Sequence, residues 1–214
     1  CEDSTGRLPY DLFCSTKVST AHTPRPWKNW YKPPVTVQVN VFREETDLLG
    51  AVNVPANALW GAHTQRAIEN FFLADRPVHR ALVHAYGAVK LAAARANHEV
   101  QPWPEATWDA ISEACEELME GRLDDAVVVD ALQGGAGTST NMNVNEVLAN
   151  RTLQLLGREL GDYAAADPHD DLNRHQSTND TYPTALRIAA IRGLRVLERR
   201  VVALQEAFQR KEQE

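Results

Sequence analysis

Apolar residues recur at intervals of three and four over three stretches of the chain. The first stretch begins after Pro77, the second ends before Gly121, and the third runs from about Thr181 to the end. Such intervals place side chains on one face of an α-helix, and helices typically have Pro near the start and Gly after the end. We therefore expect three amphipathic helices, whose apolar faces carry Val78, Leu82, Tyr86, Val89 and Ala93; Trp108, Ile111, Cys115 and Leu118; and Ala190, Leu194, Leu197, Val201, Leu204 and Phe208.

The third predicted helix is unusually long. Its apolar residues alternate by four and three, as in a coiled-coil seam, and ~32 residues of helix span roughly 48 Å. Neither Gly nor Asn caps its end. The chain holds no later helix to cover this apolar face, so we expect another subunit or further sequence to do so. Because strands and helices do not alternate, the pattern predicts an all-α bundle.

The first 40 residues differ from the rest. They hold five of the eleven prolines and two of the five tryptophans, and only residues 35–39 alternate like a short strand. We predict a Pro-rich leader without fixed structure over residues 1–40, a helical domain over 41–178, and a first, truncated bundle helix over 179–214. The chain begins with Cys rather than Met, which favours a processed product, a fragment or a doubtful gene model.

Composition excludes several classes of protein. Among 214 residues, 43% are hydrophobic and 24% charged, as in soluble globular proteins. The net charge of −7, without a Lys/Arg block, argues against a nucleic-acid partner. No apolar run approaches the ~20 residues that cross a bilayer, and no segment resembles a signal peptide. Three cysteines without metal-ligand spacing favour a reducing compartment. We therefore expect a cytoplasmic protein.

A glycine-rich stretch over residues 133–146 carries the strongest chemical signal. It reads Gln-Gly-Gly-Ala-Gly-Thr-Ser-Thr-Asn-Met-Asn-Val-Asn-Glu. A phosphate-binding loop needs a Lys before its Ser or Thr, but Gly137 directly precedes Thr138. A dinucleotide loop needs a third glycine where Thr140 stands. A nucleotide cofactor is therefore not expected.

Two other interpretations of this stretch remain. It can be a glycine turn entering a helix capped by Thr140 or Asn141. A helix start needs one such cap, however, whereas six hydroxyl or amide residues crowd into residues 138–145. Ser, Thr and Asn are middling helix formers. Their density beside helix-terminal N–H groups favours binding of an anion such as a carboxylate.

Three strings resemble, in order, signature segments of the aspartase/fumarase superfamily. They occupy residues 61–71, 133–146 and 171–184, and the resemblance extends over about residues 45–214. It implies the N-terminal helical domain of that fold, followed by the first long helix of the central helical bundle.

The resemblance also implies a chemistry and a set of substrate-binding residues. Members eliminate a group from a dicarboxylate-like substrate to form fumarate, and the carboxylate next to the abstracted proton becomes doubly charged in the transition state. Hydroxyl and N–H donors stabilise that charge. No metal and no cofactor is implied. The implied substrate-binding residues are Thr138, Ser177 and Thr178 for that carboxylate, Asn179 near the leaving group, and Ser139, Thr140 and Arg66.

Each of these residues keeps a structural alternative. Ser177 and Thr178 can cap the long helix, and Asn179 can be a turn residue. For Arg66, a surface ion pair is as plausible as neutralisation of a dicarboxylate. His169 beside Asp170 is compatible with a divalent cation, although a solvated acidic loop is favoured.

The strings favour the aspartase branch over the fumarase branch. Residues 134–140 and 177–180 and His63-Thr64 resemble aspartases, whereas residues 60–62 and Gln65-Arg66 resemble fumarases. Because the first group faces the substrate in the superfamily, we expect elimination of ammonia from aspartate. A fumarate hydratase is the alternative.

Two features of the superfamily lie outside this sequence. The general base is a Ser in a Gly-Ser-Ser loop, followed by Met-Pro-x-Lys-x-Asn, and neither segment occurs in residues 1–214. The chain is therefore expected to contain no catalytic base and to be inactive alone. Sites in the superfamily form where subunits of a homotetramer meet, which implies a homo-oligomer. A non-catalytic remnant that acts as an interaction module is a further alternative.

Overall fold

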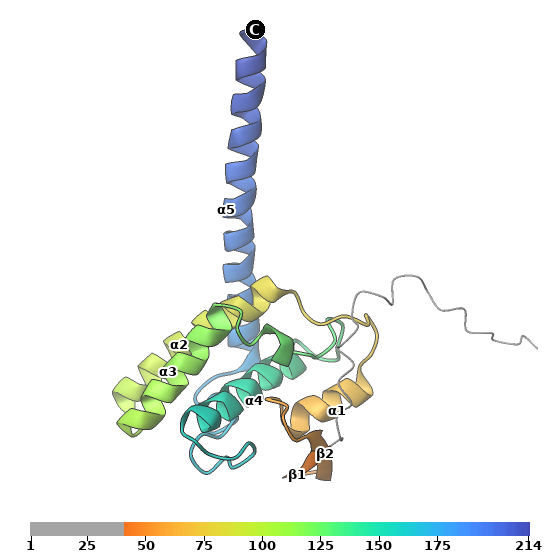
Figure 1. Ribbon diagram of the computed structural model, residues 1–214, viewed down its shortest axis with the longest axis vertical. Helices are drawn as coiled ribbons and strands as arrows, with labels where there is room; N and C mark the ends of the chain where they lie inside the picture. The colour runs from red at the N-terminus through yellow and green to blue at the C-terminus, as the bar shows by residue number, and fades with distance from the viewer. Residues whose placement is uncertain (1–40) are drawn as a thin grey trace, which may run out of the picture. The chain divides into compact units, whose positions relative to one another are not determined.

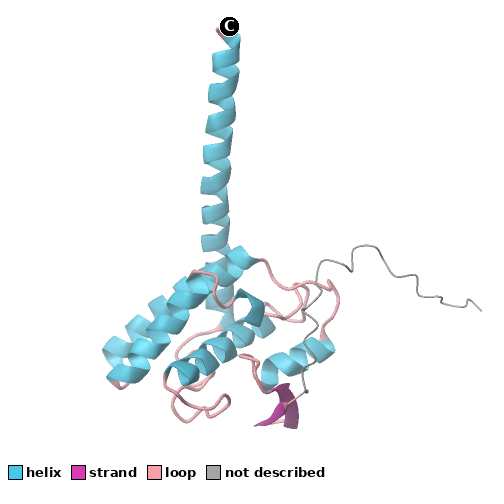
Figure 2. Ribbon diagram, in the orientation of Figure 1, coloured by secondary structure: helices cyan, strands magenta, loops and turns pink. Residues whose placement is uncertain are grey.

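The computed structural model describes residues 41–214; the leader predicted over residues 1–40 lies outside the described residues. Helices dominate the described part of the chain, as predicted, but a two-stranded hairpin precedes them (Figures 1 and 2). The elements in order are β1 (Phe42–Asp47), β2 (Gly50–Pro55), α1 (Ala62–Asn70), α2 (Arg80–Val100), α3 (Glu105–Met119), the 3₁₀ turn η2 (Asp124–Ala126), α4 (Thr138–Leu155) and α5 (Thr178–Glu212).

The hairpin was not expected from the sequence. Its strands pair antiparallel across a tight turn, in which the Asp47 carboxylate accepts from the Leu49 N–H (2.8 Å) and Gly50 has a φ of 109°. Each strand buries one side chain, Glu45 in β1 and Val54 in β2. Because one of these is charged, the alternation of apolar and polar residues that reveals a strand is missing.

Carboxylates fix the start of α1. The N–H groups of Gly61, His63 and Thr64 donate to the buried carboxylate of Glu146 in α4, at 2.9, 2.8 and 3.0 Å. Glu45 of β1 accepts from the remaining N–H of this turn. The first N–H groups of a helix lack partners within the helix, and their dipoles attract negative charge. These two side chains therefore attach α1 to α4 and to the hairpin.

The start of α2 differs from the prediction. The helix begins at Arg80 because the His79 side chain caps it, accepting from the Ala81 N–H at 3.1 Å. Pro77, expected at the helix start, instead pairs with Asp130 in an isolated bridge. The apolar spacing locates the helix, but the cap sets its first residue.

Helices α2 and α3 pack closely, because Gly87 leaves room for the α3 backbone. A Cβ at Gly87 would lie 2.7 Å from the Met119 side chain and 2.9 Å from the Cys115 carbonyl. Helix α3 ends before Gly121, as predicted, and Gly121 has a φ of 82°. The predicted apolar face of α3 is buried at Ile111, Cys115 and Leu118.

Helix α4 lies inside the described domain. From Ser139 to Leu153, every residue except Met142 and Arg151 is buried. Apolar spacing reveals a helix only when one side faces solvent, so spacing alone does not reveal α4. The glycine turn in the sequence did predict a helix at this place, but the predicted N-cap residue was wrong. The N-cap is Gly137, without a side-chain hydrogen bond, rather than Thr140 or Asn141.

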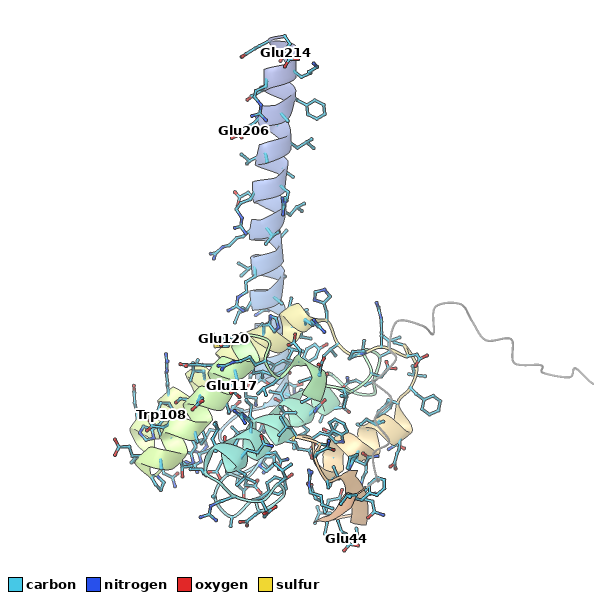
Figure 3. All side chains as sticks on the ribbon, in the orientation of Figure 1. Glu44, Trp108, Glu117, Glu120, Glu206 and Glu214 are labelled. Carbon is cyan, nitrogen blue, oxygen red and sulfur yellow. The ribbon has the colours of Figure 1, made fainter. Side chains whose placement is uncertain are left out.

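Helix α5 starts at Thr178, three residues before the predicted position. Only Thr181 and Ala185 are buried, and from Ala190 onward every residue is exposed. Figure 1 shows α5 extending beyond the other helices, and Figure 3 places Glu206 on this extension. Within residues 41–214, no helix is long and apolar enough to cross a membrane.

Candidate functional site

The first turns of α4 and α5 lie against each other. The Asn141 side-chain amide donates to the Thr178 hydroxyl (3.2 Å) and accepts from the Thr181 hydroxyl (3.2 Å). The Tyr182 ring covers Gly137, where an added Cβ would lie only 2.0 Å from the ring. Two strings about forty residues apart in the sequence thus form one site.

A cavity of about 430 Å³ opens beside these two helix starts. Residues 135–137 line it, together with Leu132, Asn179 and Tyr182 among others. Gly135 and Gly137 have φ values of 74° and 88°, a region that disfavours residues with a Cβ. At these two positions the wall of the cavity is therefore backbone.

Of the predicted substrate-binding residues, Asn179 alone lines this cavity, and it is exposed. Thr138 is exposed as the first residue of α4. Ser177 caps α5 by accepting from the Asn179 N–H at 3.1 Å, and Thr178 is half-buried. The capping role that the sequence left open for Ser177 is thus present in the structure.

Ser139 and Thr140 point into the protein. Ser139 is 6% exposed and Thr140 is fully buried. The Gln133 side chain donates to the Thr140 hydroxyl and accepts from the Thr140 N–H, both at 2.9 Å. These two hydrogen bonds join the ends of the glycine turn, so Thr140 supports the cavity wall without lining it.

Arg66 forms the ion pair considered as its structural alternative. Its guanidinium donates to both carboxylate oxygens of Asp47 (2.7 and 2.9 Å) and to the Gly50 carbonyl. The hydrogen bond from Arg66 lowers the pKa of Asp47, and the same bond raises the pKa of Arg66. These contacts hold the turn of the hairpin against α1.

The density of asparagines after the glycine turn has largely a structural cause. The Asn143 side chain accepts from the Val128 N–H (2.8 Å) and donates to the Ala126 carbonyl (3.1 Å). The Asn145 amide donates to the Asn173 side chain at 3.2 Å. The interpretation that these residues gather to bind an anion is therefore wrong for Asn143, because both ends of its buried amide have partners within the protein. The buried Oδ1 of Asn145 has no hydrogen-bond partner among the described residues.

Sequence reasoning missed a polar cluster under the α5 start. Lys90 of α2 is 1% exposed, and its ammonium group donates to the Gln176 side chain (2.8 Å), the Asn173 side chain (3.3 Å) and the Leu172 carbonyl (3.3 Å). Burial lowers the pKa of Lys90 to about 7. The available signal was its position, four residues after Tyr86 on the buried face of α2.

His169 and Asp170 contact each other on the surface. The His169 Nδ1 lies 3.0 Å from an Asp170 carboxylate oxygen, and both side chains are exposed. Over residues 41–214, no group of three or more His, Cys, Asp or Glu side chains is placed to hold a metal ion. The exposure of His169 and Asp170 shows that both side chains are solvated.

The arrangement at the cavity suits an anion. Two helix N-termini direct the positive ends of their dipoles towards this region. The hydroxyls of Thr138, Ser177 and Thr178 and the amide of Asn179 stand at these same termini. Such a site is equipped to bind a carboxylate and to stabilise negative charge that develops on it.

Comparisons with known proteins identify the family of the chain. A family model described as "Lyase" matches residues 50–214. The aspartate ammonia-lyases of Pseudomonas canavaninivorans and Escherichia coli (strain K12) are each 47% identical over 175 residues, which cover 81% and 80% of this chain. Both alignments cover 37% of the relative, so the chain spans little more than a third of the length of these curated proteins.

Solved structures share the fold. The crystal structure of fumarate lyase:delta crystallin from Brucella melitensis, in native form, is 50% identical, with a TM-score of 0.69 over 71% of this chain and 36% of that one. The crystal structure of recombinant class II fumarase from Schistosoma mansoni is 34% identical, with a TM-score of 0.65 over 70% of this chain and 32% of that one.

Proposed function

The chain belongs to the lyase family of aspartases and fumarases, and on that premise we propose that it forms the N-terminal part of an aspartate ammonia-lyase. The reaction is elimination of ammonia from L-aspartate to give fumarate. The observation that carries the proposal is the meeting of the α4 and α5 N-termini at a cavity lined by Asn179. Identity of 47% to aspartate ammonia-lyases supports the branch.

The proposed mechanism assigns charge stabilisation to this chain. Removal of the proton next to a carboxylate leaves two negative charges on that group, and a preorganised donor in a dry site stabilises such charge by ~3 kcal/mol. Thr138, Ser177 and Thr178 are the proposed donors, and Asn179 is proposed to contact the second carboxylate and the leaving group. Because donors alone do not remove the proton, the base is proposed to come from sequence outside these 214 residues.

The test is to complete the enzyme. Residues 41–214 are joined to the remaining two thirds of the Escherichia coli relative, and fumarate release is followed by its ultraviolet absorbance, with the parent enzyme as control. We expect faster release from aspartate than from malate, and no turnover by the 214-residue chain alone. Faster release from malate would establish the fumarase alternative. A chimera that folds as the parent does and releases fumarate from neither substrate would contradict both.

A second candidate function, an interaction module, is favoured by one observation. Helix α5 exposes a continuous set of large apolar side chains beyond the rest of the described chain. In this function the chain joins a full-length relative and performs no chemistry. A pull-down with the tagged Escherichia coli relative distinguishes the two, because the interaction module retains the relative whether or not the cavity residues are intact.

A further inference from the structure

Lys90 is a buried cation without a carboxylate partner. It is 1% exposed in α2, and none of the ion pairs in the described part of the chain includes it. Burying an unpaired charge is costly unless its hydrogens find acceptors. All three acceptors of Lys90 come from one short segment, at Leu172, Asn173 and Gln176.

Side-chain hydrogen bonds of Asn173 hold the segment of residues 172–176 in place around the Lys90 amine. Oδ1 of Asn173 accepts from Lys90 and from two asparagines of α4, Asn141 (3.0 Å) and Asn145 (3.2 Å). Its Nδ2 donates to the Gln176 carbonyl at 3.2 Å. A single side chain therefore connects α2, α4 and the loop before α5.

The backbone of this segment needs such support. His175 has a φ of 56°, a conformation that is unfavourable for a residue with a Cβ and persists only where the surroundings enforce it. The Gln176 side chain donates to the Leu172 and Arg174 carbonyls, which spans this residue. Lys90 holds the same Gln176 at 2.8 Å, one residue before Ser177.

We propose that Lys90 is a positioning residue: by holding the loop at Asn173 and Gln176, it fixes where residues 177–179 enter α5 beside the start of α4. It acts through these residues and does not itself line the cavity. That a dicarboxylate binds at this place rests on the proposed function. The role of Lys90 in placing the loop does not.

The experiment uses the 214-residue chain and its Lys90→Met variant. Met keeps the length of the side chain and removes the donors. Backbone amide hydrogen exchange over residues 172–179 should rise about tenfold or more, because the hydrogen bonds that hold the loop are lost. Exchange in α3 should stay at the wild-type rate. Lys211→Met is the matched control, since Lys211 is exposed near the end of α5 and its ion pair with Glu214 is local.

A second readout separates positioning from general stability. In amide NMR spectra, added fumarate should shift the Thr138 and Asn179 signals of the wild type. In Lys90→Met, the shift at Asn179 should be lost while that at Thr138 remains, whereas a uniform loss of stability would weaken both. If fumarate shifts neither signal in the wild type, the proposed function fails, and the exchange data still decide the role of Lys90.

Unchanged exchange over residues 172–179 in Lys90→Met overturns the proposal. If exchange in α3 rises equally, the variant has lost its fold, and Lys90→Gln decides, because it removes the ammonium group but keeps a polar end in the buried position and leaves the bonds of Gln176 to the Leu172 and Arg174 carbonyls intact. A rise confined to residues 172–179 then supports the proposal, and none contradicts it.

Discussion

At the residue scale, Gly137 carries the strictest requirement in the site. Its φ of 88° is unfavourable for any residue with a Cβ, and the Tyr182 ring occupies the space that a Cβ would need. The same glycine lines the cavity and caps α4. One position thus sets the backbone of the turn, the approach of α5 and the wall of the site.

Gly137→Ala should therefore destabilise the protein for two separable reasons. The left-handed conformation alone costs about 1–2 kcal/mol, and the clash with Tyr182 adds to this. Gly157→Ala is the matched control, because Gly157 has a φ of 68° but nothing within 4 Å of an added Cβ. Urea unfolding of both variants measures the difference, and equal losses would show that the approach of Tyr182 costs nothing.

Thr138→Val tests the proposed donor at the start of α4. Thr138 is exposed and makes no capping bond at the start of α4, so its replacement should change the free energy of unfolding little. In the completed enzyme, loss of one transition-state donor should lower kcat on the order of 10²-fold, with a smaller effect on KM. Thr184→Val, an exposed change in α5, should leave kcat intact. A destabilised Thr138→Val variant with near-normal kcat would remove Thr138 from the mechanism.

At the element scale, buried polar side chains join the helices in addition to apolar packing. Helix α1 starts on the Glu146 carboxylate of α4, and helices α2 and α4 meet the loop before α5 at Asn173. These contacts are buried, so each leaves an unpaired group if one partner is lost. Two predictions follow from this arrangement.

Glu146→Gln should destabilise the protein by about 1–3 kcal/mol, because the carboxamide NH₂ faces backbone donors that the carboxylate accepts. Glu69→Gln is the control, since Glu69 is an exposed residue of α1, the helix whose start the Glu146 carboxylate holds. Thermal and urea unfolding compare the two. Equal stability of both variants would show that α1 does not depend on this carboxylate.

Lys90 should make stability depend on pH in the alkaline range. Burial lowers its pKa from 10.5 to about 7 in the folded protein, so between these values the unfolded chain binds more protons. The free energy of unfolding of the wild type, minus that of Lys90→Met, should therefore rise with pH from about 7 towards 10.5, and level off below about 7, where the folded and unfolded chains both hold the proton. The slope is at most ~1.4 kcal/mol per pH unit. Urea unfolding of both proteins at a series of pH values checks this, and a flat difference contradicts it.

At the scale of the whole molecule, α5 presents more apolar surface than a monomer usually exposes. Leu194, Leu197, Val201, Leu204 and Phe208 are each 53–68% exposed and repeat at the spacing of a helical seam. Contiguous apolar surface of this kind typically marks a contact with another protein. A homo-oligomer remains the prediction for this chain.

Leu197→Glu combined with Leu204→Glu should weaken self-association without unfolding the domain, because both side chains are exposed and lie beyond the core. Sedimentation velocity over a range of concentrations measures the association, and circular dichroism monitors the fold. Arg200→Glu, an exposed charged residue on the same helix, is the control. A wild-type chain that sediments as a monomer at every concentration contradicts the prediction.

The sequence by itself determined the features that depend on residues near one another in the chain. Apolar spacing located α2, α3 and α5 within a few residues, Gly121 marked the end of α3, and three ordered strings identified the family. The glycine turn before α4 was also predicted, because a backbone with positive φ requires glycine locally.

Only the tertiary structure decided which polar groups meet. Lys90 and Gln176 lie 86 residues apart in the sequence, and Gly61 and Glu146 lie 85 apart. No local pattern specifies such pairs, because any buried donor must find an acceptor and packing alone determines which one is near. For the same reason, the fold directed Thr140 inward and left Asn179 at the cavity, although both strings suggested a substrate contact.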